Sequence, residues 1–480
     1  MRTVIMAGLL SSLALAAPAQ AVTCGDVLAR IGGQLADVNC FHSPDLTTAN
    51  PATGPFATTP ANNAILTLPA LAFTPITDRG VISPTVHTAI AGPVPGIQLD
   101  ARYADDATGE ARFLLRLPDT WNGDLVVAGA SGTRSEFNGD WAWSDYVLQK
   151  GFAYASQNKG ILNLFLVGVS VAAPASDPLA CRLNPLSPVW VHFYDNDPAK
   201  PFTEWQSRMV QAARTAREGV KGAYDHFPRH TFAVGTSNGG YQVRRAVEEA
   251  PDLFDGGVDW EGTFVDGDTF NILSDLPAAL RNFPSNPAAI EAAGYPPDIH
   301  NAAGASLYAN YWGQFWEVTQ CQWQKRLDPT YDTYGAGAAN YDYFARTQVS
   351  DVEQNLNAFA TTGKIKVPLI TVAGTMDALL PIKHHARAYA DKVAASRKGN
   401  DDQRSAQYRL YEVQNGNHIE TYVDQFPQLQ LIQPHAQKAF DLLVDHVENG
   451  AALPPDQCIP RNGTISGNAT PGRCAQLLAP

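Results

Sequence analysis

The stretch HTFAVGTSNGGYQVRR, residues 230–245, most narrows the folds open to this chain. An apolar run ends in Ser237, which has a glycine two positions before it and another two positions after it, and a helical pattern follows. A serine on a tight strand-to-helix turn needs this arrangement, because side chains at Gly235 and Gly239 would collide with neighbouring backbone. The pattern predicts a nucleophile elbow with an exposed hydroxyl. The alternative is a glycine-rich turn with a structural serine.

Short apolar runs alternate with long helical patterns on both sides of this turn. The expected strands are RFLLRL, DLVVAGA, GFAYASQN, HTFAVG, GGVDWEG, VPLITVAG and YRLYEVQNG. The expected helices are residues 203–224, with Thr203 as N-cap, and residues 238–251. Strands that alternate with helices favour an α/β fold, with a mostly parallel central sheet covered by helices on both faces.

Composition changes along the chain suggest an inserted segment. Aromatic side chains crowd into residues 266–364, where the alternation stops, and we expect a lid there; alternatively, these rings form the insertion's own core. Stretches rich in Pro, Thr and Ala predict an irregular N-terminal layer. The expected organisation is a signal peptide at 1–21, an irregular layer at 22–110, a catalytic core at 111–265 and 365–450, a lid at 266–364, and a loop-like tail at 451–480.

The N-terminus and the charge balance indicate where the protein works. Residues 1–21 carry Arg2, an apolar run and a final Ala-Gln-Ala, the pattern of a secretory signal peptide, so we expect a secreted chain that starts near Val22. No later segment offers about 18 uninterrupted apolar residues, so no membrane span is expected. The formal net charge of −13 disfavours a nucleic-acid partner.

All six cysteines follow the predicted signal peptide, and an even number in an exported chain predicts up to three disulfides. The sequence leaves the pairing open. Two of the favoured pairs close short loops; the three are Cys24 with Cys40, Cys181 with Cys321, and Cys458 with Cys474. A zinc site is the weaker interpretation, because the sequence contains no CxxC or HExxH motif, and we expect no metal or cofactor.

A nucleophilic serine needs an acid and a base, each in a loop after a later strand. The segment VPLITVAGTMDALLP offers Asp377 as the acid, and YRLYEVQNGNHIETY offers His418 as the base. The order Ser237, Asp377, His418 is therefore complete. Asp259 is the rival acid, because it ends the strand that follows the serine, and the histidines at 384–385 are expected to cap or pack.

Cleavage of an ester or amide also needs two hydrogen-bond donors where the oxyanion forms. The backbone N–H of Asn238, directly after the serine, is the first expected donor. The second is expected from the loop after DLVVAGA, at Ser131, Gly132 or Thr133, unless that loop is an ordinary strand-ending turn. The candidates for substrate contact, with packing as the equal alternative, are Arg134, Trp141, Trp312 and Trp316.

Several segments carry a family resemblance: VGTSNGGYQVRRAVE, VAGTMDALLP, GNH, and the pair LVVAGASG and GFAYASQNKG. Together they resemble the α/β-hydrolase superfamily. Within it, the chain is similar to secreted esterases with a large lid, such as the tannase and feruloyl esterase group and the hydroxybutyrate oligomer and polyester hydrolases. Tannases and feruloyl esterases typically place bridged cysteines directly before the serine and the histidine. Here, Thr236 and Asn417 occupy those positions.

The sequence thus predicts a serine carboxylic-ester hydrolase that acts through an acyl-enzyme on a bulky, partly apolar ester. An aryl ester and a hydroxyalkanoate oligomer or polyester are the two substrate classes that the resemblance implies. An amidase or serine peptidase is the alternative, because the same three residues cleave esters and amides alike. A non-catalytic binding protein on this fold is the third possibility.

Overall fold

The computed structural model describes residues 22–53, 87–132, 134–161, 165–192, 202–331, 336–397 and 407–480. The predicted signal peptide at residues 1–21 lies outside these ranges.

The described strands form a 10-stranded sheet in the order β1-β2-β3-β5-β4-β9-β10-β11-β12-β13. From β5 to β13 all neighbours are parallel, whereas β1, β2, β3 and β5 pair antiparallel. The strands are β1 (Leu35–Ser43), β2 (Gly96–Tyr103), β3 (Arg112–Pro118), β4 (Leu125–Gly129), β5 (Ala153–Gln157), β9 (Thr231–Thr236), β10 (Gly256–Trp260), β11 (Leu369–Gly374), β12 (Tyr408–Val413) and β13 (Gln457–Ile459).

Helices cover both faces of this sheet, because successive apolar residues of each strand point to opposite sides. In β9, Ala233 packs into one core layer, whereas Phe232 and Val234 pack into the other. The first layer includes α1 (Cys24–Ile31), α5 (Thr203–Tyr224), α6 (Asn238–Glu249) and α14 (Ala386–Arg397); the second includes α4 (Asp145–Leu148) and α15 (Gln433–Asn449). This is the α/β-hydrolase fold, and the predicted fold class is confirmed. Helix α5 starts at Thr203, so Phe202 and not Thr203 is its N-cap.

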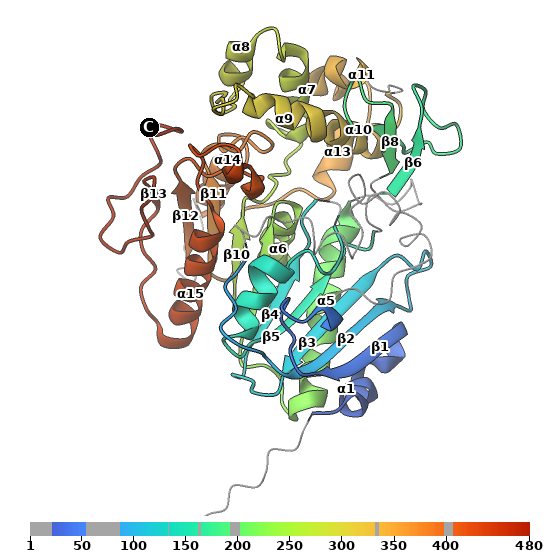
Figure 1. Ribbon diagram of the computed structural model, residues 1–480, viewed down its shortest axis with the longest axis vertical. Helices are drawn as coiled ribbons and strands as arrows, with labels where there is room; N and C mark the ends of the chain where they lie inside the picture. Colours follow the sequence, from blue (N-terminus) through green and yellow to red (C-terminus); the bar gives the residue numbers. More distant parts are fainter. Residues whose placement is uncertain are drawn as a thin grey trace, which may run out of the picture.

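A group of helices, here called the insertion, lies between β10 and β11 in the chain and above the sheet in Figure 1. Its aromatic rings are mostly buried in a core shared with Met376, Leu379 and Tyr422 of the main domain, so packing accounts for most of them. Phe270 differs, with 51% of its surface exposed. The helices are α7 (Ile272–Asn282), α8 (Pro287–Ala292), α9 (Leu307–Gln314), α10 (Trp316–Leu327), α11 (Ala336–Asn340), α12 (Tyr343–Arg346) and α13 (Val352–Asn357).

The two ends of the described chain differ from the sequence-based expectation. Residues 22–110 were predicted to form an irregular layer, but β1 and β2 extend the main sheet. Polar residues on β2 mask its apolar pattern: Gln98 and Asp100 are buried, and Gln98 accepts a hydrogen bond from Arg116 on β3. The tail at 451–480 likewise contributes β13, which pairs with β12.

Three disulfides join the pairs that the sequence favours: Cys24–Cys40, Cys181–Cys321 and Cys458–Cys474. The second attaches α10 to a small sheet of β6 (Phe165–Val169), β8 (Val189–His192) and β7 (Cys181–Arg182), seen at the upper right of Figure 1. Among the described helices, none combines the length and apolar character needed to cross a membrane.

Replacing Cys181 and Cys321 together by alanine should lower the free energy of unfolding more than replacing Cys24 and Cys40. These disulfides span 140 and 16 residues, respectively. Because a longer closed loop restricts the unfolded chain more, the difference should be about 2 kcal/mol. Urea unfolding of both double variants measures it. The third disulfide also spans 16 residues, so its removal should lower the free energy of unfolding as much as removal of Cys24–Cys40. An equal decrease for all three disulfides would contradict the prediction.

Candidate active site

Ser237 lies on the turn between β9 and α6 in a conformation that few non-glycine residues adopt. Its φ is 58° and its ψ is −121°, and its N–H donates to the Trp260 carbonyl at 2.9 Å. Ser237 as a whole is 5% exposed, so the prediction of an exposed hydroxyl is wrong in this structure. The positive φ is the backbone strain that the glycine pattern predicted for this serine.

The backbones of three glycines meet below this turn. A Cβ on Gly239 would lie 2.4 Å from the carbonyl oxygen of Gly129 at the end of β4. A Cβ on Gly235 would lie 2.3 Å from the carbonyl oxygen of Gly239. Glycine is therefore required at Gly235 and Gly239, because no side chain can give way when the obstacle is backbone.

His418 and Asp377 reach the serine from loops after two further parallel strands. His418 Nε2 lies 3.1 Å from Ser237 Oγ, and Nδ1 lies 2.8 Å from Asp377 Oδ2. The backbone N–H groups of Leu379 and Leu380 donate to Asp377 Oδ1 at 2.8 and 2.7 Å. The three predicted residues are thus brought into one hydrogen-bonded chain, in the geometry that lets an imidazole take a proton from the serine.

Asp259, the rival acid, is engaged elsewhere. It is buried and accepts hydrogen bonds from Arg244 at 2.6 Å and Thr371 at 2.8 Å. Of the two acids in this segment, Glu261 and not Asp259 lies near His418, with Oε2 3.5 Å from Nδ1. The sequence motif GGVDWEG contains both acids, but only the one beyond the strand end points to the edge where the loops gather.

The expected oxyanion donors differ in availability. Asn238 is the first residue of α6, where backbone N–H groups have no partner within the helix. The N–H of Ser131 donates to Asn138 Oδ1 at 3.0 Å, so Ser131 is not available and its assignment was wrong. Gly132 is half-buried with a φ of 24°, a Cβ added to it would meet no atom within 4 Å, and it stays a candidate donor; Thr133 lies outside the described residues.

Lys159, which the sequence analysis did not select, holds this loop. Its buried ammonium group donates to the carbonyl oxygens of Ala130 and Ser131 at 2.9 and 3.0 Å. The only hint in the sequence is a charged residue at the end of the strand GFAYASQN. Lys159 therefore fixes the carbonyl side of the loop whose N–H groups are candidates for the oxyanion hole.

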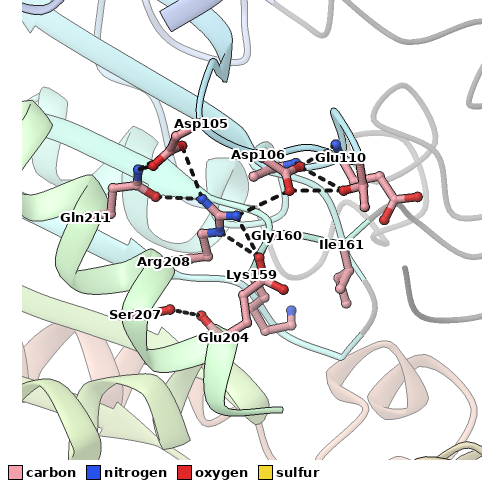
Figure 2. Close-up of polar contacts among 12 residues, drawn as sticks. Asp105, Asp106, Glu110, Lys159, Gly160, Ile161, Glu204, Ser207, Arg208 and Gln211 are labelled. Atoms are coloured by element: carbon pink, nitrogen blue, oxygen red, sulfur yellow. Dashed lines mark hydrogen bonds and ion pairs between the residues drawn. The ribbon is translucent and has the colours of Figure 1, made fainter. Parts of the chain in front are cut away.

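The turn at Lys159 and Gly160 packs against a cluster of charged residues. Figure 2 shows Arg208 of α5 between acidic groups of the loop after β2 and of its own helix, with Lys159 and Gly160 beside them. Arg208 lies 3.4 Å from Asp106 and 2.7 Å from Glu204. A Cβ on Gly160 would lie 2.5 Å from Glu204, so the turn packs closely against α5.

The insertion is hydrogen-bonded to the acid loop and the base loop. Tyr311 of α9 donates to Asn417 Oδ1 at 2.9 Å, and Asn417 directly precedes His418. Trp316 of α10 donates to the carbonyl of Ala378 at 2.7 Å, directly after Asp377. Because Trp316 is fully buried, it has no surface for a substrate, so its prediction as a substrate contact is wrong and the packing alternative holds.

The other three residues predicted to contact substrate are partly exposed. Trp141 is half-buried and stacks on His87 with ring centroids 3.7 Å apart. Trp312 is half-buried against Phe283, with centroids 6.1 Å apart. Arg134, also half-buried, lies on the chain after the predicted oxyanion loop. These three stay candidates for substrate contact.

Residues 324–479 match the model of the 3HB-oligomer hydrolase family. The chain is similar there to a D-(-)-3-hydroxybutyrate oligomer hydrolase from Burkholderia ambifaria, with 32% identity over 154 residues, covering 31% of this chain and 21% of that protein. A protein of the same description from Burkholderia cenocepacia is 36% identical over 116 residues, covering 23% and 15%. The match thus spans about a fifth or less of these relatives' lengths.

Solved structures with a similar chain course include tannin acyl hydrolase from Aspergillus niger, with 13% identity, a TM-score of 0.48, and coverage of 90% of this chain and 87% of that one. Feruloyl esterase B from Aspergillus oryzae has 14% identity, a TM-score of 0.45, and coverage of 89% and 91%.

Replacing Gly239 by alanine should destabilise the protein by about 1–3 kcal/mol, because the new Cβ meets the Gly129 carbonyl. Gly313→Ala on α9 is the matched control, since nothing lies within 4 Å of its Cβ position, and it should be neutral or slightly stabilising. Urea unfolding of the two variants distinguishes them. Equal stability of Gly239→Ala and the unmodified protein would contradict the close approach.

Proposed function

We propose that this protein is a serine carboxylic-ester hydrolase in which Ser237 is the nucleophile, His418 the general base and Asp377 the acid that orients the base. The observation that carries the proposal is the hydrogen-bonded chain from Ser237 Oγ through His418 to Asp377, at 3.1 and 2.8 Å. A strained serine at the carboxyl edge of a parallel sheet, next to a helix N-terminus, supports the same assignment.

In the proposed reaction, Ser237 Oγ attacks the acyl carbon while its proton passes to His418 Nε2. The N–H groups of Asn238 and Gly132 stabilise the oxyanion. The imidazolium then gives its proton to the leaving alkoxide, and an acyl-enzyme remains. Water, deprotonated by His418, attacks this ester, and the imidazolium returns the proton to Ser237 Oγ as the acid is released. Asp377 keeps the imidazole in the required tautomer throughout.

The proposed substrate is an oligomer of 3-hydroxybutyrate, an aliphatic chain of ester bonds that is partly apolar. Support comes from the match of residues 324–479 to the 3HB-oligomer hydrolase family and from the Burkholderia relatives of that description. Most rings of the insertion are buried in its core, and the half-buried Trp312 stays a candidate for contact with an ester of this polarity.

We also propose that the protein is exported. Residues 1–21 have the pattern of a signal peptide, and the three disulfides are stable in an oxidising compartment.

Ser237→Ala should lower kcat by about 10⁶-fold, because it removes the nucleophile. The purified protein and this variant are compared on a 3-hydroxybutyrate trimer, a methyl ferulate ester and a matched butyramide. Hydrolysis of the trimer that Ser237→Ala abolishes supports the proposal. Preferred cleavage of ferulate would move the substrate to aryl esters, and preferred cleavage of the amide would refute an esterase. Activity retained by pure Ser237→Ala would refute the nucleophile.

Lys159→Met should lower kcat by about 10–100-fold with a small change in KM, because the loop that carries a proposed oxyanion donor loses its anchor. Lys325→Met is the matched control. Lys325 also donates to two loop carbonyls, those of Pro178 and Ala180 at 2.8 and 2.9 Å, but beside the small sheet. Steady-state kinetics on one ester compares the two. An equal effect of both substitutions on kcat would contradict a role for Lys159 in the site.

A further inference from the structure

A second carboxyl group faces the same imidazole nitrogen as Asp377. Glu261 follows β10 directly, is 3% exposed, and has Oε2 at 3.5 Å from His418 Nδ1, whereas Asp377 Oδ2 lies at 2.8 Å from that atom. One ligand atom from each of the three side chains lies within 4.8 Å of the others. The strand order β9-β10-β11-β12 produces this cluster, because β10, between the serine strand and the acid strand, also ends at the carboxyl edge.

The structure holds Glu261 in place at the cost of backbone strain. Its φ is 52°, in the left-handed region that non-glycine residues rarely adopt. Its N–H donates to the Val372 carbonyl at 2.9 Å, and its Oε1 accepts from the N–H of Gly374 at 2.9 Å. These contacts aim the remaining oxygen, Oε2, at the imidazole.

Glu261 Oε2 has no hydrogen-bond partner among the described residues. Glu261 also lines a small cavity of about 10 Å³, together with Asp377 and His385. A buried carboxyl oxygen without a hydrogen-bond partner destabilises the folded protein. Its presence beside the proposed triad therefore indicates a function there.

The charge of Asp377 controls the charge of Glu261. Burial raises the pKa of Glu261 well above its usual range, and the neighbouring Asp377 carboxylate raises it further. Two carboxyl groups this close do not both ionise readily, which opposes ionisation of Glu261 beside the Asp377 carboxylate. When Asp377 loses its charge, that repulsion disappears and ionisation of Glu261 becomes easier.

We propose that Glu261 is a reserve acid of the triad, whose Oε2 accepts a hydrogen bond from the Nδ1–H of His418 when Asp377 cannot. This inference rests on the proposed function, since it assumes that His418 acts as the base for Ser237. The 3.5 Å separation closes to a hydrogen bond by a small rotation of a carboxyl group whose second oxygen stays on Gly374.

The test is a double-substitution cycle with Glu261→Gln and Asp377→Asn, in which kcat and KM are measured on one nitrophenyl ester. Glutamine keeps the size of the side chain and an oxygen for Gly374, so the fold is preserved, which thermal unfolding checks. A triad with a single acid loses about 10⁴-fold in kcat when that acid becomes an amide. With Glu261 in reserve, Asp377→Asn alone should lose only about 100-fold, and the double variant about 10⁴-fold.

Glu261→Gln in the unmodified protein should lower kcat less than about 3-fold, with KM unchanged in every variant. Glu420→Gln is the matched control in both backgrounds, because Glu420 is another buried carboxyl near Glu261 but accepts from the N–H of Gln433 at 2.8 Å. It should not deepen the loss caused by Asp377→Asn. If Glu261→Gln lowers kcat by the same factor in both backgrounds, the reserve role is overturned.

Ser237→Ala, measured in the same series, separates the two proposals. An active Ser237→Ala variant refutes the proposed function itself. An inactive one, together with equal factors for Glu261→Gln in both backgrounds, overturns only the role of Glu261.

Discussion

Ser237 owes its position to the close approach of three glycine backbones, at Gly129, Gly235 and Gly239. The end of β4, the end of β9 and the start of α6 meet there with no space for a Cβ at Gly235 or Gly239. This contact sets the serine's φ of 58° and places the first N–H groups of α6 beside its hydroxyl. It also brings the loop after β4 against the same turn, so nucleophile and predicted oxyanion donors depend on one packing constraint.

The loops of Asp377 and His418 are held from two sides by groups distant in sequence. On one side, Tyr311 and Trp316 of the insertion donate to Asn417 and Ala378. On the other side, the C-terminal tail contributes: Asn415 and Ala479 form two reciprocal hydrogen bonds, at 2.9 and 2.7 Å. Buried polar groups must be paired, so each bond restricts the loop that takes part in it. The Tyr311 hydroxyl thus holds Asn417, the residue directly before His418.

The similarity to 3HB-oligomer hydrolases covers residues 324–479, which include the loops of the proposed acid and base but not Ser237. The tertiary structure joins the two parts of the site, because the parallel strands β9, β11 and β12 all end at the same edge of the sheet. Glu261 enters through β10 for the same reason. The geometry of this edge therefore connects the serine to the segment that resembles the family.

The sequence by itself determined the α/β class, the elbow around Ser237, and the order of Asp377 and His418, because each depends on a local pattern of residues. It left the cysteine pairing open, and the structure joins the three favoured pairs. It did not reveal β2, whose buried Gln98 and Asp100 hide its apolar face, or the engagement of Ser131 by Asn138. Only the tertiary structure decided that Lys159 anchors the predicted oxyanion loop, that Trp316 is buried, and that Glu261 rather than Asp259 faces His418. These outcomes depend on contacts between distant strands, helices and loops, whose directions a linear pattern of polar and apolar residues does not contain.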